Sequence, residues 1–181
     1  MSAAAGIRLR LATPDDAEAV RAIYNHEVEH TTATFDLVVR SLDDQRAWLA
    51  ARSGAFGTIV AVEATSHYLV GFASLSPYKE RAAYRTSVED SVYVRRDAHG
   101  RGIGRALLSH VLDLAEDSGF HAVMARIEAS GTASRALHAR CGFDLVGIER
   151  EIGRKFGRWL DVALMQCLLH ERRARLPSAA R

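Results

Sequence analysis

Three glycines and two arginines separate a short apolar segment from a long amphipathic one, and this order limits the fold more than any other feature of the chain. The glycine turn, residues 99–105, reads His-Gly-Arg-Gly-Ile-Gly-Arg. The apolar residues that begin within it recur at helical spacing: Ile103, Leu107, Val111 and Leu114. Because valines and a tyrosine precede the turn, the sequence predicts a strand, a tight turn and then a helix.

The glycine turn has the features of a phosphate-binding site. Gly100, Gly102 and Gly104 have no Cβ atom, so a ligand can approach the backbone closely. The first amides of a helix lack partners within the helix, and the helix dipole makes this end positive. Arg101 and Arg105 add full positive charges. We therefore expect an anionic cofactor at this turn, and one that carries a pyrophosphate fits it best.

The glycine turn has three other interpretations. A nucleoside triphosphate loop requires Lys followed by Ser or Thr after the last glycine, and Arg105 and Ala106 stand there instead, which excludes it. A dinucleotide fingerprint requires a glycine where Leu107 stands, although Glu128 could imitate its ribose-binding acid. A turn without any ligand is the third, but three glycines and two arginines exceed what a turn requires.

Several segments together resemble one protein family. The glycine turn resembles the acetyl-CoA pyrophosphate loop of the GCN5-related N-acetyltransferases, the GNAT superfamily. Further segments resemble its phosphinothricin and methionine sulfoximine acetyltransferase branch, and they lie at 23–26, 31–35, 74–77, 88–94 and 153–161. The resemblance implies acetyl-CoA as co-substrate. It also implies a small amino acid-like acceptor such as phosphinothricin, methionine sulfoximine or methionine sulfone.

The remaining pattern predicts an α/β domain with the GNAT fold, a mixed and largely antiparallel seven-stranded sheet flanked by about four helices. Strands are expected at 7–11, 58–62, 68–75, 86–95, 122–127, 143–149 and 159–168. Helices are expected from Pro14 to about residue 29, and near 42–51, 103–118 and 133–140. Residues 1–169 are expected to form a single domain, and the Arg- and Ala-rich residues 170–181 a frayed tail.

Composition excludes several classes of protein. With 181 residues, 48% of them hydrophobic, the chain has the size and composition of one globular domain. A net charge of only +2 gives no reason to expect a nucleic-acid partner. Neither a signal peptide nor a membrane span is expected, because no long apolar segment occurs. Cys141 and Cys167 lack metal-ligand spacing, so we expect no metal and two reduced thiols in a cytoplasmic protein.

The resemblance assigns a set of cofactor-binding residues. They are Val92, Tyr93, Val94, His99, Gly100, Arg101, Gly102, Ile103, Gly104, Arg105, Gly131 and Ser134. Val92 and Val94 are expected to bind the pantetheine arm through their backbones. Two positions depart from the family: His99 stands where Arg or Gln is usual, and Gly131 where the branch commonly has Asn. Thr132 or Ser134 could replace the contact of that Asn, or cofactor affinity could be lower.

Two residues are candidates for catalysis. An amine is mostly protonated at neutral pH, so a base must remove its proton directly or through water. Glu89 matches the catalytic glutamate of the family; without that resemblance, a carboxylate paired with a nearby arginine would be the simpler interpretation. His138 matches a family histidine near the acetyl group, although a lone helical histidine is usually a boundary residue. Asp90 should point to the opposite face of the strand from Glu89 and be structural.

The acceptor side is expected to be cationic. The substrate-binding candidates are Phe35, Lys79, Arg81, Tyr84 and Arg85. A solvated charged loop is the alternative for the last four, and a loop anchor for Phe35. Lys155, Phe156, Arg158 and Trp159 could complete the pocket across a homodimer interface, which the family commonly forms. A protein N-terminal acetyltransferase and a CoA-binding sensor without turnover are the alternative functions.

Overall fold

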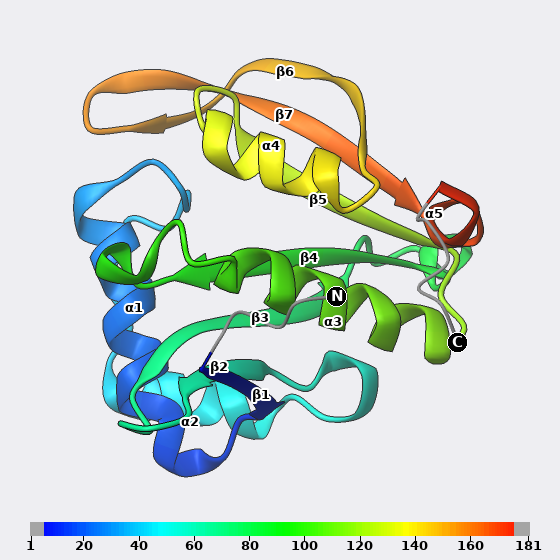
Figure 1. Ribbon diagram of the computed structural model, residues 1–181. Helices are drawn as coiled ribbons and strands as arrows, with labels where there is room; N and C mark the ends of the chain where they lie inside the picture. The colour runs from blue at the N-terminus through cyan, green and yellow to red at the C-terminus, as the bar shows by residue number, and fades with distance from the viewer. Residues whose placement is uncertain (1–5, 176–181) are drawn as a thin grey trace.

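One seven-stranded sheet organises the chain in this computed structural model, which describes residues 6–175, the side chains of 173–175 excepted (Figure 1). The strands lie in the order β1-β2-β3-β4-β5-β7-β6. Their bounds are β1 Ile7–Leu11, β2 Ile59–Glu63, β3 Leu69–Pro77, β4 Ser87–Val94, β5 Ala122–Glu128, β6 Asp144–Lys155 and β7 Arg158–Leu168. The α-helices are α1 Ala17–His30, α2 Leu42–Ala50, α3 Ile103–Asp117, α4 Thr132–Arg140 and α5 Leu169–Arg175.

The centre of the sheet contains a split. All neighbouring strands pair antiparallel except β4 and β5, which are parallel and pair over three residues, from Ser87–Ala122 to Glu89–Met124. Beyond Glu89 and Met124 the two strands are no longer paired. We call this unpaired stretch the β4–β5 split. It divides the sheet into β1–β4 and β5–β7, each held by antiparallel pairing.

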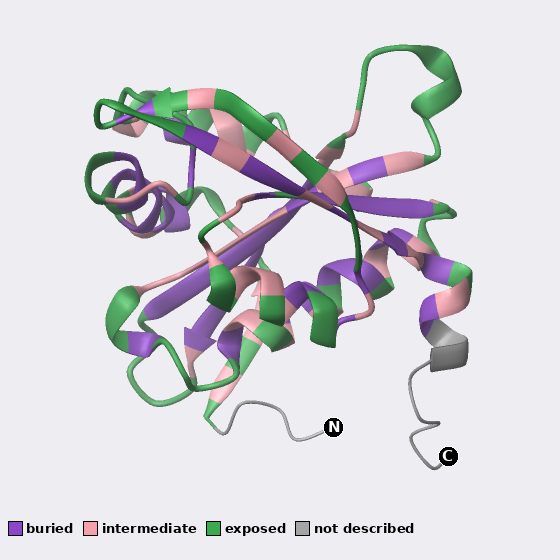
Figure 2. Ribbon diagram, turned by 90° about the horizontal axis from the view of Figure 1, so that it is seen from above, coloured by how far each residue is buried: buried purple, intermediate pink, exposed green. Residues whose placement is uncertain are grey.

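Each face of the sheet has its own core. On one face, Val20 and Tyr24 of α1 pack with Phe72 of β3, and Trp48 of α2 lies against them. On the other face, Leu107 and its neighbours on α3 pack on β2–β4, while α4 contacts β5. We call these the α1 face and the α3 face. Figure 2 shows the buried residues concentrated in the central strands, with exposed residues on the outer connections.

The predicted fold is confirmed, with two differences at the C-terminal end. β6 continues to Lys155, beyond the predicted end at residue 149, because most of its residues are exposed on both faces and therefore show no apolar alternation. The expected frayed tail instead begins with α5, whose Leu169 is buried and whose Arg172 Nη1 lies 2.7 Å from Asp113 Oδ1 on α3. Residues 176–181 of that tail lie outside the described residues.

Candidate active site

The glycine turn presents open backbone at the start of α3. Gly100 and Gly102 have φ values of 76° and 78°, in the left-handed region that favours glycine, and nothing lies within 4 Å of a Cβ added to Gly100. The first hydrogen bond of α3 runs from the Ala106 amide to the Gly102 carbonyl at 3.1 Å. The amides of residues 103–105 therefore have no acceptor within the described part of the chain. This geometry fits a pyrophosphate.

Two side chains of the glycine turn are already held within the protein. Arg101 Nη1 lies 2.7 Å from Glu63 Oε1 at the end of β2, so its charge is shared with a carboxylate. His99 Nε2 lies 2.9 Å from the Val94 carbonyl oxygen. The expected contribution of Arg101 to anion binding is thus weakened, and His99 closes the turn back onto β4.

The backbone of β4 faces the split at alternate residues. The Arg95 amide donates to the Val70 carbonyl on β3 at 2.8 Å. Because successive residues direct their backbone groups to opposite edges of a strand, Val92 and Val94 direct theirs into the split. Tyr93 does not reach it: its ring packs on Tyr24 with centroids 5.3 Å apart, inside the core of the α1 face.

Glu89 stands where β4 and β5 separate. Its register partner Met124 shares its face, which is also the face of Tyr93 and therefore the α1 face. Glu89 is half-buried. Burial raises the pKa of Glu89 above its ordinary value; the Arg126 charge partly offsets this, and Asp90 and Glu149 add to it. A raised carboxylate pKa suits a group that must accept a proton near neutral pH.

His138 is placed on the opposite face of β4 from Glu89. Its Nε2 lies 3.1 Å from Asp90 Oδ2, and its Nδ1 lies 2.8 Å from the Ser134 carbonyl oxygen. Both partners are acceptors, so this geometry favours the doubly protonated ring, in which both nitrogens donate. Burial alone would lower the pKa of His138, but Asp90 and the Ser134 carbonyl outweigh it and raise the pKa. No ring nitrogen is left free to receive a proton from an acceptor amine.

The 31–35 loop crosses the split on the α1 face. Thr32 Oγ1 donates to Glu128 Oε2 of β5 at 3.0 Å. The buried Lys155 of β6 donates to the Thr34 carbonyl oxygen at 2.8 Å. The ring of Phe35 lies so close to Gly153 that a Cβ there would stand 2.2 Å from Phe35 Cε2. In Figure 1 this connection between α1 and α2 lies beside the β6–β7 hairpin.

The cationic candidates lie at the other end of β4. Lys79, Arg81 and Arg85 are exposed in the β3–β4 connection, which enters β4 next to the pair Pro77–Val88. The rings of Tyr84 and Tyr78 meet edge to face, and Lys79 Nζ lies 5.2 Å from the Tyr84 ring centroid. The 31–35 loop meets β5 at its far end, Glu128. Within one chain, Glu89 therefore lies nearer to the cationic β3–β4 connection than to the 31–35 loop. Phe35 does not lie beside the cationic residues.

Gly131 and Ser134 begin α4. A Cβ on Gly131 would stand 2.9 Å from the Glu128 carbonyl oxygen, which accepts the Gly131 amide at 2.8 Å. The glycine is therefore required by this tight turn, and an asparagine would force the turn open. Ser134 Oγ lies 3.5 Å from His138 Nδ1, so its hydroxyl is directed toward that ring.

Sequence reasoning missed Arg126. It lies on β5 two residues beyond Met124, on the same face as Glu89, and its Nη2 stands 2.8 Å from Glu149 Oε2. The sequence feature that could have indicated Arg126 is that it is the one charged residue in the otherwise apolar segment 122–127.

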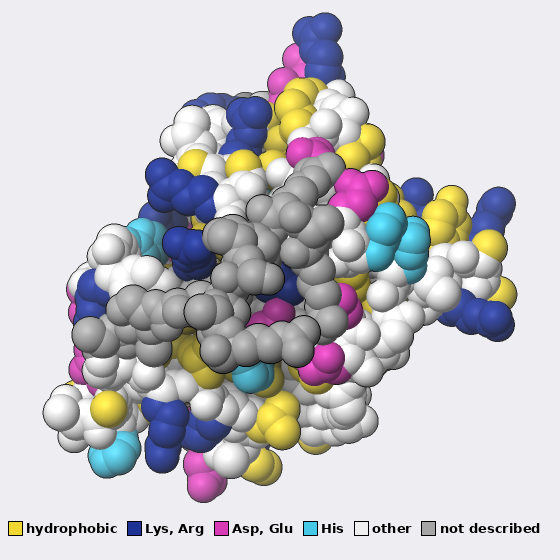
Figure 3. Space-filling view, turned by 45° about the vertical axis from the view of Figure 1, so that its right-hand side comes forward, with side chains coloured by type: hydrophobic (Ala, Val, Ile, Leu, Met, Phe, Trp, Pro, Cys, Tyr) yellow, Lys and Arg dark blue, Asp and Glu magenta, His cyan; other side chains and the backbone are white. Residues whose placement is uncertain are grey.

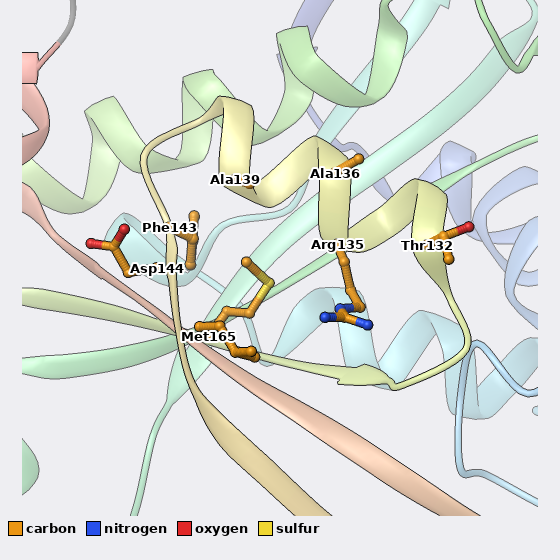
Figure 4. A pocket seen from close by; sticks show the side chains of 8 residues that line it. Thr132, Arg135, Ala136, Ala139, Phe143, Asp144 and Met165 are labelled. Carbon is orange, nitrogen blue, oxygen red and sulfur yellow. The ribbon is translucent and has the colours of Figure 1, made fainter.

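A surface hollow lies elsewhere. Figure 4 shows it between α4 and strands β6 and β7, with Arg135 and Met165 among its lining residues. Met165 belongs to the core of the α3 face, so this hollow is on the opposite face of the sheet from Glu89. It is not the expected acceptor site.

Two further findings concern residues 6–175. Their His, Cys, Asp and Glu side chains form no group of three or more that could hold a metal ion. None of the helices in this range combines the length and the apolar character needed to cross a bilayer.

The surface carries mixed charge: positive and negative side chains lie side by side on the face shown in Figure 3.

Comparisons with known proteins agree with one another. Residues 9–164 match the family model described as an acetyltransferase (GNAT) domain. The chain is 40% identical over 165 residues to phosphinothricin N-acetyltransferase of Streptomyces coelicolor, which covers 90% of this chain and 96% of that protein. It is 38% identical over 166 residues to L-methionine sulfoximine/L-methionine sulfone acetyltransferase of Salmonella typhimurium, covering 92% and 96%. A crystal structure of phosphinothricin acetyltransferase from Sinorhizobium meliloti in complex with AcCoA matches with a TM-score of 0.87 and 34% identity, over 97% of this chain and 95% of that one.

Proposed function

The chain belongs to the GNAT acetyltransferase family, and we propose that it transfers the acetyl group of acetyl-CoA to the α-amino group of a small amino acid analogue. Phosphinothricin, methionine sulfoximine and methionine sulfone are the proposed acceptors. The observation that carries the proposal is the position of Glu89: a half-buried carboxylate with a raised pKa, at the residue where β4 leaves β5.

The glycine turn and β4 are the proposed binding site of acetyl-CoA. The amides of Ile103, Gly104 and Arg105 would hold the pyrophosphate, with the charges of Arg101 and Arg105 nearby. The backbone groups of Val92 and Val94 would pair with the pantetheine arm in place of the missing strand. His99 already donates to one of these groups, the Val94 carbonyl.

Glu89 is the proposed proton acceptor. Bound acetyl-CoA supplies the acetyl thioester. Glu89 takes a proton from the acceptor ammonium group, directly or through water, and the freed amine nitrogen forms a bond to the acetyl carbon while the carbon–sulfur bond breaks. The nitrogen then loses a second proton, which passes through solvent to the leaving thiolate, so that the products are the amide and the free thiol. His138 is assigned a different role, because both its ring nitrogens are engaged: it holds α4 against β4 through Asp90.

The acceptor is proposed to lie on the α1 face. The 31–35 loop with Phe35 would cover one end of its site, and Lys79, Arg81, Tyr84 and Arg85 would provide cations at the other. Both free cysteines are buried, which is compatible with the reducing cytoplasm that we propose as its location.

A homodimer is also proposed. β6 is an edge strand, and it exposes apolar side chains at Leu145, Val146, Ile148 and Ile152. An exposed apolar edge favours burial against a second copy. We expect light scattering after size exclusion to give twice the chain mass, and Val146→Arg to shift the protein toward the monomer. A wild-type protein that stays monomeric at all concentrations would contradict the dimer.

A thiol-release screen tests the proposed function. Acetyl-CoA is offered with phosphinothricin, methionine sulfoximine, methionine sulfone, the natural amino acids and short peptides with free N-termini. We expect thiol release with the amino acid analogues and little with the peptides. Preference for peptides would favour a protein N-terminal acetyltransferase. Binding of acetyl-CoA without release for any amine would favour a sensor.

A further inference from the structure

Arg126 lies on the same face of the sheet as Glu89, and it is not one of the site residues that the sequence predicts. The side chains of the pair Glu89–Met124 point to the same face, and side chains alternate along β5, so Arg126 and Glu128 share the face of Glu89. The bond from Thr32 to Glu128 places that face under the 31–35 loop. Arg126 is thus the first residue of β5 on the α1 face after the strands separate.

Glu149 forms an ion pair with the Arg126 guanidinium. Glu149 Oε2 lies 2.8 Å from Arg126 Nη2, and the Arg126 side chain keeps 36% of its exposure. Glu149 stands on β6, so the contact reaches across β7. No other carboxylate lies within ion-pair distance of Arg126 in the described part of the chain. One carboxylate therefore keeps the guanidinium nearby by charge without a well-aligned hydrogen bond, and the N–H groups of Arg126 remain available to a ligand.

The carboxylates around Arg126 would repel an anionic acceptor unless a cation lay among them. Glu89, Glu128 and Glu149 all lie near Arg126 on this part of the sheet. An acceptor carboxylate that approached Glu89 without Arg126 would meet repulsion from like charges. Arg126 provides the opposite charge at that point, and a guanidinium can bind both oxygens of a carboxylate at once.

We propose that Arg126 binds the α-carboxylate of the acceptor while Glu89 receives the proton of its α-amino group. The inference rests on the proposed function and specifies which end of the acceptor the enzyme recognises. In an α-amino acid the amine and the carboxylate are attached to the same carbon, so the two protein groups that read them must stand side by side. Arg126 is then a specificity-determining residue, and Glu149 is its positioning residue.

The test compares methionine sulfone with its α-carboxamide, which keeps the amine and loses the negative charge. With Arg126→Met, we expect the KM for methionine sulfone to rise about a hundredfold, because a charged partner of the carboxylate is removed. The KM values for acetyl-CoA and for the carboxamide should stay within about twofold. Arg126→Lys should recover part of the loss, since the charge returns without the paired geometry. Arg8→Met on edge strand β1 is the matched control and should change none of these values.

Two outcomes would overturn the inference. One is an unchanged KM for methionine sulfone in Arg126→Met, and the other is an equal rise for the carboxamide, as a merely structural ion pair would give. Calorimetric binding of methionine sulfone to the protein separates this from failure of the proposed function. If the wild type binds methionine sulfone but transfers no acetyl group, the function fails, and loss of binding in Arg126→Met still supports the inference. If the wild type does not bind it at all, both fail.

Discussion

Replacing Glu89 by Gln is expected to lower kcat by about 10²–10⁴-fold at neutral pH, the range that a positioned general base contributes. The amide keeps the size of the side chain and cannot accept the proton of the acceptor amine. Because the glycine turn and the backbone of β4 are untouched, the Kd for acetyl-CoA should stay within about twofold. Stopped-assay thiol release and calorimetry with acetyl-CoA measure the two quantities separately.

The pH dependence of the wild type gives a second measure of the same group. Only the carboxylate form of Glu89 accepts a proton, so kcat/KM should fall as pH falls through the pKa of Glu89, which burial raises above its ordinary value. This acidic limb should disappear in Glu89→Gln. Glu18→Gln, at an exposed carboxylate on α1, is the control and should leave the whole profile unchanged. Near-wild-type kcat in Glu89→Gln would show that another group, or solvent alone, removes the proton.

Replacing Asp90 by Ala is expected to lower the free energy of unfolding by about 3–5 kcal/mol, the cost of leaving one partner of a buried pair behind. The side chains of Asp90 and His138 are 1% and 3% exposed, and the second oxygen of Asp90 is buried without a hydrogen-bond partner among the described residues. Without Asp90 the charged ring of His138 has no counter-charge. Urea unfolding followed by circular dichroism measures the change.

Two comparisons separate this cost from a general effect of mutation. Asp97→Ala removes the carboxylate of the exposed pair with Arg95 and should cost no more than about 1 kcal/mol. The double variant Asp90→Asn/His138→Gln restores a neutral hydrogen bond and should recover much of the loss. An Asp90→Ala protein as stable as Asp97→Ala would mean that His138 is neutral and weakly held.

The stability of the wild type should also depend on pH through His138. Its pKa is raised in the folded protein, so the stabilisation is complete below the ordinary pKa of histidine and is lost as pH rises through the folded value. In Asp90→Ala this loss of stability with rising pH should disappear, because burial of the ring then acts without its main opposing charge and lowers the pKa of His138.

The elements that repeat regularly are the ones that the sequence predicts well. Leu107 and Val111 follow helical spacing, and α3 begins and ends close to its predicted limits. The end of β6 could not be predicted in the same way. Residues 149–155 alternate poorly because most of them are exposed on both faces and the register shifts between Glu149 and Gly153. Their pairing with β7 depends on residues that lie on the other side of a turn.

The site was predictable where it depends on local backbone and not where it depends on pairing. Gly100 and Gly102 adopt the left-handed backbone conformation that favours glycine, as the spacing of the glycines predicts. The importance of Arg126 follows from the residue at which β4 and β5 stop pairing, which no local pattern reveals. Likewise, the sequence predicts that Phe35 and Lys79 both serve the acceptor, but only the parallel run of β4 and β5 shows that their loops lie at opposite ends of the proposed site.

The short parallel pairing between β4 and β5 connects two parts of the sheet, β1–β4 and β5–β7. Residues 7–117 and 122–168 each contain an antiparallel part of the sheet with its own helices, and the three pairs from Ser87–Ala122 to Glu89–Met124 are the only strand pairing that joins the two parts in the described chain. A ligand that contacts both strands beyond Glu89 binds only when the two parts are together, so its binding free energy stabilises their association. Ligand binding should therefore strengthen the association of the two parts of the sheet, in addition to the side-chain contacts and the shared core that already join them.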